Sequence, residues 1–375
     1  MHLLLWAEDS ESELRLELAR SFPGAPIRLA GAALLETDFD VVGGRRLPHL
    51  AFVRQWLPNA RAVLGNSIRA FAGEVFDSVA GILPDGRPWS LHITPQYGAR
   101  AVHRVGARAW HSAVRMRQPP RSASASCGPA AEAGRHRCRL IREALIEMLR
   151  RKRRHFLRSL RDDPALFTAD DSLVQLLLTA PDRGFLSVAK APLPFEQRHL
   201  LSPFPNGVLP VASDKSAPSR AFAKLVEAEL RLGRTIGPDE VCVDLGAAPG
   251  SWTYVAVGRG ASVTAVDRSP LREDLMEHSR VRFLEGDAFR FQPEKPVDWL
   301  LCDVIADSAQ TAGLLLRWLQ CKWCRHFVVT LKLKDDFGIE FLEALKRDLA
   351  ALTQELFLTR LCANKKELCA FGSAS

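Results

Sequence analysis

The sequence predicts an α/β protein whose C-terminal part is a Rossmann-like, doubly wound sheet, preceded by an α+β half. Three observations lead to this fold class. Val241–Leu245 is an apolar run broken only by Asp244, and a tight Gly/Ala/Pro loop and a helix-like segment follow it. A second acidic residue, Asp267, ends the next strand-like run, Ser262–Val266. From Ser219 onward helical and strand-like patterns alternate, which is typical of a parallel sheet.

The N-terminal half divides at clusters of turn residues. Residues 1–70 mix short apolar runs with Pro/Gly punctuation, which predicts one small subdomain. Residues 71–195 form the second predicted domain. Within it Trp89–Thr94 alternates like a strand, and residues 173–179 and 184–189 are predicted to pair as two strands.

A basic segment lies inside this second domain. A stretch near 118–137 is rich in Ser, Ala and Pro and is predicted to be a flexible insertion, and a helix is predicted from Cys138 to Leu160. Residues 101–160 hold 14 Arg and 1 Lys against 3 Glu, a net charge of +12, so the rest of the chain carries −4. Such a concentration favours a nucleic-acid partner, although a solvated Arg-rich helix face is the alternative.

The C-terminal half begins after a proline-rich approach. Six prolines fall between Ala191 and Ser219, and we interpret residues 196–218 as a linker to a domain over 219–375. A helix is predicted at Ala221–Gly233. Strands are predicted at 241–245, 262–266, 299–302 and 327–331, with helices between them.

Bulk properties exclude several classes of protein. The 375 residues contain no run of 18 apolar residues, and acidic residues follow the short apolar N-terminal run at once, so we expect a cytoplasmic protein rather than a membrane or exported one. Cys321 and Cys324 form a single C-x-x-C with no second half, so we expect no metal site.

The loop after the first C-terminal strand indicates a ligand that carries a ribose but no phosphate. It lacks the three-glycine spacing of dinucleotide-binding loops, and Pro249 removes a backbone N–H that could bind phosphate. Asp267 stands where a carboxylate could accept hydrogen bonds from ribose hydroxyls. S-adenosylmethionine is the most common such ligand; an ordinary strand–turn–helix remains the alternative.

Two segments carry a family resemblance. Asp244–Thr253 resembles the first motif of the FtsJ-like ribose 2'-O-methyltransferases, and Pro218–Ala228 resembles the helix before it. Phe52–Trp56 and Arg317–Arg325 are similar to segments of the members that act on large-subunit ribosomal RNA. The resemblance covers about residues 200–375 well. For the N-terminal half it implies a ferredoxin-like subdomain at 1–70 and a THUMP-like RNA-binding domain at 71–195.

The resemblance also implies a catalytic tetrad, formed by Lys224, Asp303, Lys332 and Glu367. A ribose 2'-hydroxyl becomes a good nucleophile when a base takes its proton, and a lysine can serve only as the neutral amine. Lys332 is the expected base, with a pKa lowered by burial and by the neighbouring Lys224. Lys334, two residues along the same strand, is a competitor for this role, whereas Lys365 and Lys366 are expected to face solvent.

The cofactor residues are also carried over from the resemblance. S-adenosylmethionine would be held by Gly246, Ala248, Pro249, Gly250, Ser251, Asp267, Asp287 and Asp303. This chain departs from the family at two of its positions: Ser251 stands where a glycine is usual, and Ala221 stands where a serine is usual. Whether Ser219 replaces that serine stays open.

Together these features predict an S-adenosylmethionine-dependent RNA 2'-O-ribose methyltransferase, and the resemblance implies that its target is a cytidine of 23S rRNA or of the large-subunit precursor. Two alternatives remain. One is a non-catalytic RNA-binding or ribosome-assembly protein that keeps the fold, for which Lys332→Ala would be silent. The other is a dehydrogenase, which the missing three-glycine loop disfavours.

Overall fold

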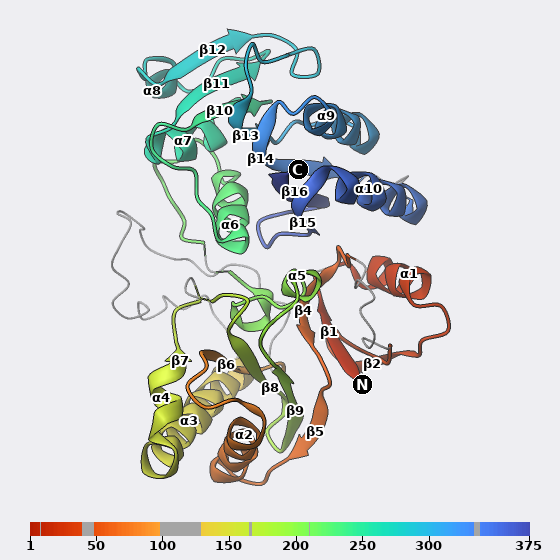
Figure 1. The fold of residues 1–375 in the computed structure, drawn as a ribbon, viewed down its shortest axis with the longest axis vertical. Coiled ribbons are helices and arrows are strands. Elements are labelled where there is room, and N and C mark those ends of the chain that lie inside the picture. The colour runs from red at the N-terminus through yellow and green to blue at the C-terminus, as the bar shows by residue number, and fades with distance from the viewer. Residues whose placement is uncertain (8, 40–48, 98–128, 165–166, 210, 334–337) are drawn as a thin grey trace. The chain divides into compact units, whose positions relative to one another are not determined.

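The structure is a computed structural model that describes residues 1–375 except 8, 40–48, 98–128, 165–166, 210 and 334–337. Its chain forms two units, one N-terminal to residue 210 and one from Val211 to Ser375. Each unit is described by itself (Figure 1).

The N-terminal unit contains two sheets. The first has the order β2-β3-β1-β4, all antiparallel, and carries one helix, α1 (Glu11–Ser21). Its strands are β1 (His2–Trp6), β2 (Ile27–Gly31), β3 (Leu34–Thr37) and β4 (Val53–Leu57). The second has the order β5-β9-β8-β6-β7. Its strands are β5 (Arg61–Leu64), β6 (Trp89–Pro95), β7 (Leu160–Arg161), β8 (Ser172–Ala180) and β9 (Arg183–Ala189).

Helices α2 (Ile68–Ile82) and α3 (Pro129–Lys152) pack together over the second sheet, and α4 (Arg154–Ser159) follows them. Their apolar faces share one buried core with Trp89. The strand at 89–94 and the antiparallel pair β8–β9 confirm the sequence prediction. The boundary expected at residue 70 falls inside α2, and the expected linker includes α5 (Phe195–Arg198) and a 3-10 turn at Pro205–Gly207. The ferredoxin-like and THUMP-like assignments stay predictions.

Two sequence predictions in the basic segment were wrong. Residues 129–137, expected to belong to a flexible insertion, are the start of α3; the rest of that insertion lies outside the described residues. Small residues there let α3 pack closely against Pro95 at the end of β6. A Cβ added at Gly134 would lie only 2.9 Å from Cβ of Pro95, which is too close for a larger side chain. The expected single helix from 138 to 160 is two helices, since Arg153 leaves the helical region at φ −148° and ψ 54°.

The C-terminal unit confirms the doubly wound sheet. Its seven strands have the order β12-β11-β10-β13-β14-β16-β15, and the first five run parallel. They are β10 (Val241–Leu245), β11 (Ser262–Asp267), β12 (Val281–Glu285), β13 (Val297–Cys302), β14 (Cys324–Lys332), β15 (Thr353–Thr359) and β16 (Glu367–Ala374). Strand β16 is antiparallel to both of its neighbours. All four strands predicted at 241–331 are present.

Helices cover both faces of this sheet. Figure 1 shows α6 (Phe222–Leu232) and α7 (Ser251–Gly258) on one side and α9 (Ser308–Gln320) and α10 (Ile339–Leu352) on the other, with α8 (Glu273–Met276) beside β12. The chain goes from β10 to β11 in one direction and returns to add β13 on the other side. Ligands of doubly wound sheets bind at such a reversal, beyond the carboxyl ends of the strands.

Candidate active site

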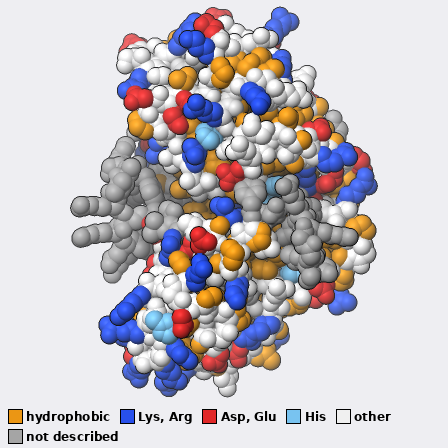
Figure 2. Space-filling view, in the orientation of Figure 1, with side chains coloured by type: hydrophobic (Ala, Val, Ile, Leu, Met, Phe, Trp, Pro, Cys, Tyr) orange, Lys and Arg blue, Asp and Glu red, His pale blue; other side chains and the backbone are white. Residues whose placement is uncertain are grey.

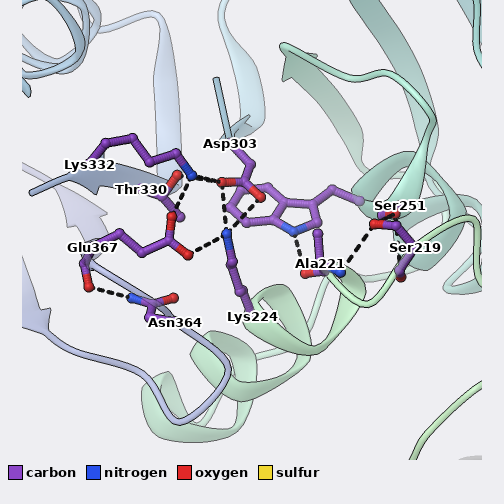
Figure 3. Close-up of polar contacts among 10 residues, drawn as sticks. Ser219, Ala221, Lys224, Ser251, Asp303, Thr330, Lys332, Asn364 and Glu367 are labelled. Carbon is purple, nitrogen blue, oxygen red and sulfur yellow. Dashed lines mark hydrogen bonds and ion pairs between the residues drawn. The ribbon is translucent and has the colours of Figure 1, made fainter. Parts of the chain in front are cut away.

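Two lysines and two carboxylates form a closed ring at that edge of the sheet (Figure 3). Nζ of Lys224 lies 3.0 Å from each carboxylate oxygen of Asp303 and 2.6 Å from Oε1 of Glu367. Nζ of Lys332 lies 2.8 Å from Oδ1 of Asp303 and donates to Oε2 of Glu367. The structure therefore brings together all four residues expected from the sequence. Their roles in catalysis remain to be tested.

Separate elements deliver these four side chains. Lys224 lies in the first turn of α6, and Asp303 directly follows β13. Lys332 ends β14 and Glu367 begins β16, and the antiparallel register places these two residues directly opposite each other. Because β16 runs against β14, its first residue meets the carboxyl ends of the parallel strands.

Thr330 is a further member of the site that the sequence analysis missed. Its hydroxyl donates to Oδ1 of Asp303 at 2.6 Å. Residues two apart on a strand share one face, so the spacing from Thr330 to Lys332 could have revealed it. The hydrogen bond fixes the oxygen of Asp303 that also binds Lys332.

The electrostatics of the ring differ from expectation in one respect. Burial opposes the charge of Lys332, but the carboxylates of Asp303 and Glu367 outweigh it, so the pKa of Lys332 is raised. The lowered pKa expected for this base was therefore wrong for the ring as it stands. Burial likewise opposes ionisation of Asp303, but Lys224 and Lys332 together lower the pKa of that carboxyl. The ring holds two positive and two negative charges.

Glu227, one turn after Lys224 on α6, holds the loop that leads into β16. This side chain is fully buried, and its carboxylate accepts the backbone N–H of Cys362 at 2.8 Å and of Ala363 at 3.3 Å. Arg231 donates to the same carboxylate at 2.8 Å. A single helix thus supplies Lys224 and also anchors the loop before Glu367.

The loop after β10 has little capacity to bind a phosphate group. The backbone N–H groups of Gly246 and Ala247 donate to the carbonyl of Val266, and that of Gly250 donates to Ala247 at 2.6 Å. The N–H of Ala248 donates to Oδ2 of Asp267 at 3.0 Å. Over residues 246–250, four backbone N–H groups are thus occupied within the protein and Pro249 has none to offer. The geometry fits a ligand without phosphate.

The two acidic residues assigned to the cofactor follow neighbouring strands. Asp267 ends β11, and its other oxygen accepts the N–H of Ser269 at 2.9 Å. A carboxylate has about four acceptor sites, so Asp267 can still accept from hydroxyls. Asp287 lies two residues past β12, and the N–H of Phe289 and the guanidinium of Arg268 hold the pKa of its carboxyl below the usual range.

Ser251, at one of the two positions where this chain departs from the family pattern, lies in contact with Ser219. The two hydroxyls lie 2.7 Å apart, and the N–H of Ala221 donates to Oγ of Ser219 at 3.2 Å (Figure 3). A hydroxyl therefore lies two residues before Ala221, next to the hydroxyl of Ser251, and its part in cofactor binding stays a prediction.

Asp244 has a strongly perturbed acidity. It is buried in β10, and burial raises the pKa of its carboxyl to about 7, although the hydroxyl of Thr253 donates to it at 2.7 Å. Asp244 lies two residues before Gly246, so its ionisation is expected to affect the stability of the loop after β10.

Further lysines and cysteines were singled out from the sequence. Lys334 is outside the described residues, and Lys365 and Lys366 are exposed, as expected. Cys321 is exposed, whereas burial raises the pKa of the Cys324 thiol to about 12. Within the described ranges, no group of three or more His, Cys, Asp or Glu could hold a metal ion. A cavity of about 550 Å³ lies at the start of β14, at the opposite edge of the sheet from the ring.

No helix in the described part of the chain is both long and apolar enough to cross a membrane. Basic side chains gather over α4 and the end of α3 in the N-terminal unit (Figure 2). Residues 150–154 are all exposed there, and Glu147 pairs with Arg150 and Arg151.

Comparisons with known proteins show similarity to methyltransferases. The FtsJ-like methyltransferase family model matches residues 217–328. The chain is 35% identical over 198 residues to a ribosomal RNA large subunit methyltransferase M of Thauera aminoaromatica, covering 50% of this chain and 54% of the relative. It is 40% identical over 170 residues to the protein of the same name from Pseudomonas putida strain W619, covering 43% and 46%. The chain spans about half the length of the curated relatives it matches.

Similar solved structures include TrmN of Thermus thermophilus, at 16% identity and a TM-score of 0.29 over 99% of both chains. Another is a Burkholderia thailandensis 1,6-didemethyltoxoflavin-N1-methyltransferase with bound S-adenosylhomocysteine, at 19% identity and a TM-score of 0.33, covering 42% of this chain and 79% of that one. The assignment depends on the family match, the sequence relatives and the strand order. Residues 217–328 of the C-terminal unit therefore match the FtsJ-like methyltransferase family, and the chain is similar over about half of its length to ribosomal RNA large subunit methyltransferases M.

Proposed function

We propose that this protein transfers a methyl group from S-adenosylmethionine to the 2'-hydroxyl of a cytidine in 23S rRNA or its large-subunit precursor. The observation that carries the proposal is the ring of Lys224, Asp303, Lys332 and Glu367 at the carboxyl edge of the sheet. The names of the curated relatives support large-subunit rRNA as the substrate.

The loop after β10 would hold the cofactor. Gly246 and residues 248–251 would line its methionine end, Asp267 its ribose and Asp287 its adenine, with Asp303 near the sulfonium. The fit follows from the loop's occupied N–H groups and from the acceptor sites that Asp267 keeps. When bound, S-adenosylmethionine supplies an electrophilic methyl group on a sulfonium, which is already a good leaving group.

The remaining task is to activate and align the ribose hydroxyl. Lys332, as the neutral amine, receives the proton of the 2'-hydroxyl while the oxygen accepts the methyl group. Asp303 and Glu367 hold this amine in place, and Lys224 helps to keep the pKa of the Asp303 carboxyl low, so that Asp303 stays ionised. Alignment of this kind is worth several orders of magnitude in a bimolecular displacement.

The N-terminal unit would capture the RNA. The exposed cations of residues 150–154 form a surface suited to phosphates, and an rRNA substrate places the protein in the cytoplasm. In this proposal the basic unit provides affinity and the C-terminal unit provides chemistry.

Methyl transfer from labelled S-adenosylmethionine to unmodified 23S rRNA, followed by mapping of 2'-O-methyl groups, tests the proposal. We expect one methylated cytidine and measurable cofactor binding. Cofactor binding with no methyl transfer to free rRNA or to large-subunit precursor particles would contradict the proposal that 23S rRNA is the substrate. RNA binding with no cofactor binding would favour the non-catalytic alternative.

A further inference from the structure

One apolar side chain beside the ring is almost fully exposed. Ile305 has 92% of its surface accessible, whereas the other exposed large apolar side chains among the described residues range from 41% to 75%. It lies two residues after Asp303, whose carboxylate contacts both lysines of the ring. Water around an exposed isoleucine is costly, and its burial by a ligand is favourable.

The loop that presents Ile305 is braced on both sides. Val304 packs closely against Gly246 in the loop after β10. A Cβ added at Gly246 would lie only 2.9 Å from Cα of Val304. After it, Oδ1 of Asp307 accepts the N–H of Ala309 at 2.8 Å and caps α9. Ser308 then donates its hydroxyl to the carbonyl of Lys332.

These contacts tie the loop that carries Ile305 to two parts of the proposed site. One anchor of its loop is the candidate cofactor loop at Gly246, and the other is the backbone of the expected base, Lys332. The backbone of a loop held at both ends loses little conformational freedom when a ligand covers one of its side chains. More of the contact energy therefore contributes to the free energy of binding.

We propose that Ile305 packs against the base of the nucleotide whose 2'-hydroxyl is methylated. This inference rests on the function proposed above. RNA enzymes commonly bind an unstacked base against aromatic or apolar side chains, because every base offers a flat apolar face. A ribose at the ring would carry its base outward, and Ile305 is the exposed apolar surface next to the ring.

The test compares two RNA fragments that carry the mapped target. One is intact, and the other has an abasic ribose at that position and keeps its 2'-hydroxyl. Ile305→Ala is expected to lower kcat/KM about tenfold on the intact fragment and less than about twofold on the abasic one, with cofactor affinity and thermal midpoint unchanged. Ile305→Phe should keep activity on the intact fragment.

Val241→Ala is the matched control, because Val241 is 42% exposed and begins β10 at the other edge of the sheet. It should leave both rates unchanged. Equal losses for Ile305→Ala on the two fragments, or no loss on either, would overturn the inference. If the wild-type protein methylates no RNA, the proposed function fails and the inference fails with it.

Discussion

Removing Lys224 should destabilise the protein, and removing Glu367 in addition should cost less than removing Glu367 alone. In the wild type each carboxylate of the ring contacts two ammonium groups. Lys224→Met leaves two ionised carboxylates with Lys332 as their shared cation. The side chains of Lys224 and Glu367 are only 10% and 6% exposed, so water can replace little of the lost contact.

The magnitude follows from this burial. Breaking a buried ion pair by removing one partner costs about 3–5 kcal/mol, and we expect the lower end because Lys332 remains. For a unit of this size that corresponds to a fall of about 6–12 °C in the thermal midpoint. Adding Glu367→Gln to Lys224→Met leaves one carboxylate for one ammonium. The double variant should therefore lose about 2 kcal/mol less free energy of unfolding than the sum of the two single losses.

Scanning calorimetry of the intact chain measures these shifts, and the transition raised by added S-adenosylhomocysteine identifies the C-terminal unit. Arg325→Met serves as the control, because the side chain of Arg325 is 79% exposed and pairs at 3.0 Å with Asp298 in the same unit. That variant should lose about 1 kcal/mol or less. Losses for Lys224→Met and Glu367→Gln that simply add in the double variant would refute the coupled ring.

Three further predictions concern pH and salt. Because the carboxylates raise the pKa of Lys332, the neutral base is scarce at neutral pH, so log kcat/KM should rise by about one per pH unit from pH 7 to 9; a plateau starting near pH 7 would contradict this. The raised pKa of Asp244, about 7, means that the folded state binds a proton which the unfolded state releases near pH 4. The free energy of unfolding of Asp244→Asn, relative to that of the wild type, should therefore increase between pH 4 and 7 and then stay constant. A difference between the two proteins that does not change from pH 4 to 7 would contradict the raised pKa. Replacing the four Arg of residues 150–154 by Gln should reduce the slope of log RNA affinity against log salt concentration by about two or more. An unchanged slope would show that this segment does not contact the RNA.

Local sequence signals predicted the core of the C-terminal domain well. The apolar run into Asp244 and the Gly/Ala/Pro loop after it determine a strand, a turn and a helix within a dozen residues. Asp267 and Asp303 could be placed because each ends or follows a strand, and parallel strands share one edge.

Features that depend on distant contacts were less accessible. The pairing of Lys332 with Glu367 depends on β16 joining the sheet antiparallel beside β14, which no local pattern specifies. The pKa of Lys332 was predicted in the wrong direction because the sequence could not show two carboxylates on one ammonium. The start of α3 was mistaken for a flexible insertion because small side chains that permit close packing have the same composition as a linker.

The most direct test of the central claim is single-turnover methyl transfer by Lys332→Ala beside Lys365→Ala. Lys365 is an exposed lysine in the loop before Glu367, so it controls for loss of a cation near the site. We predict that Lys332→Ala lowers the transfer rate by about 10³-fold or more while cofactor and RNA affinities stay within about twofold, and that Lys365→Ala keeps the wild-type rate. A Lys332→Ala rate within tenfold of wild type would contradict Lys332 as the base.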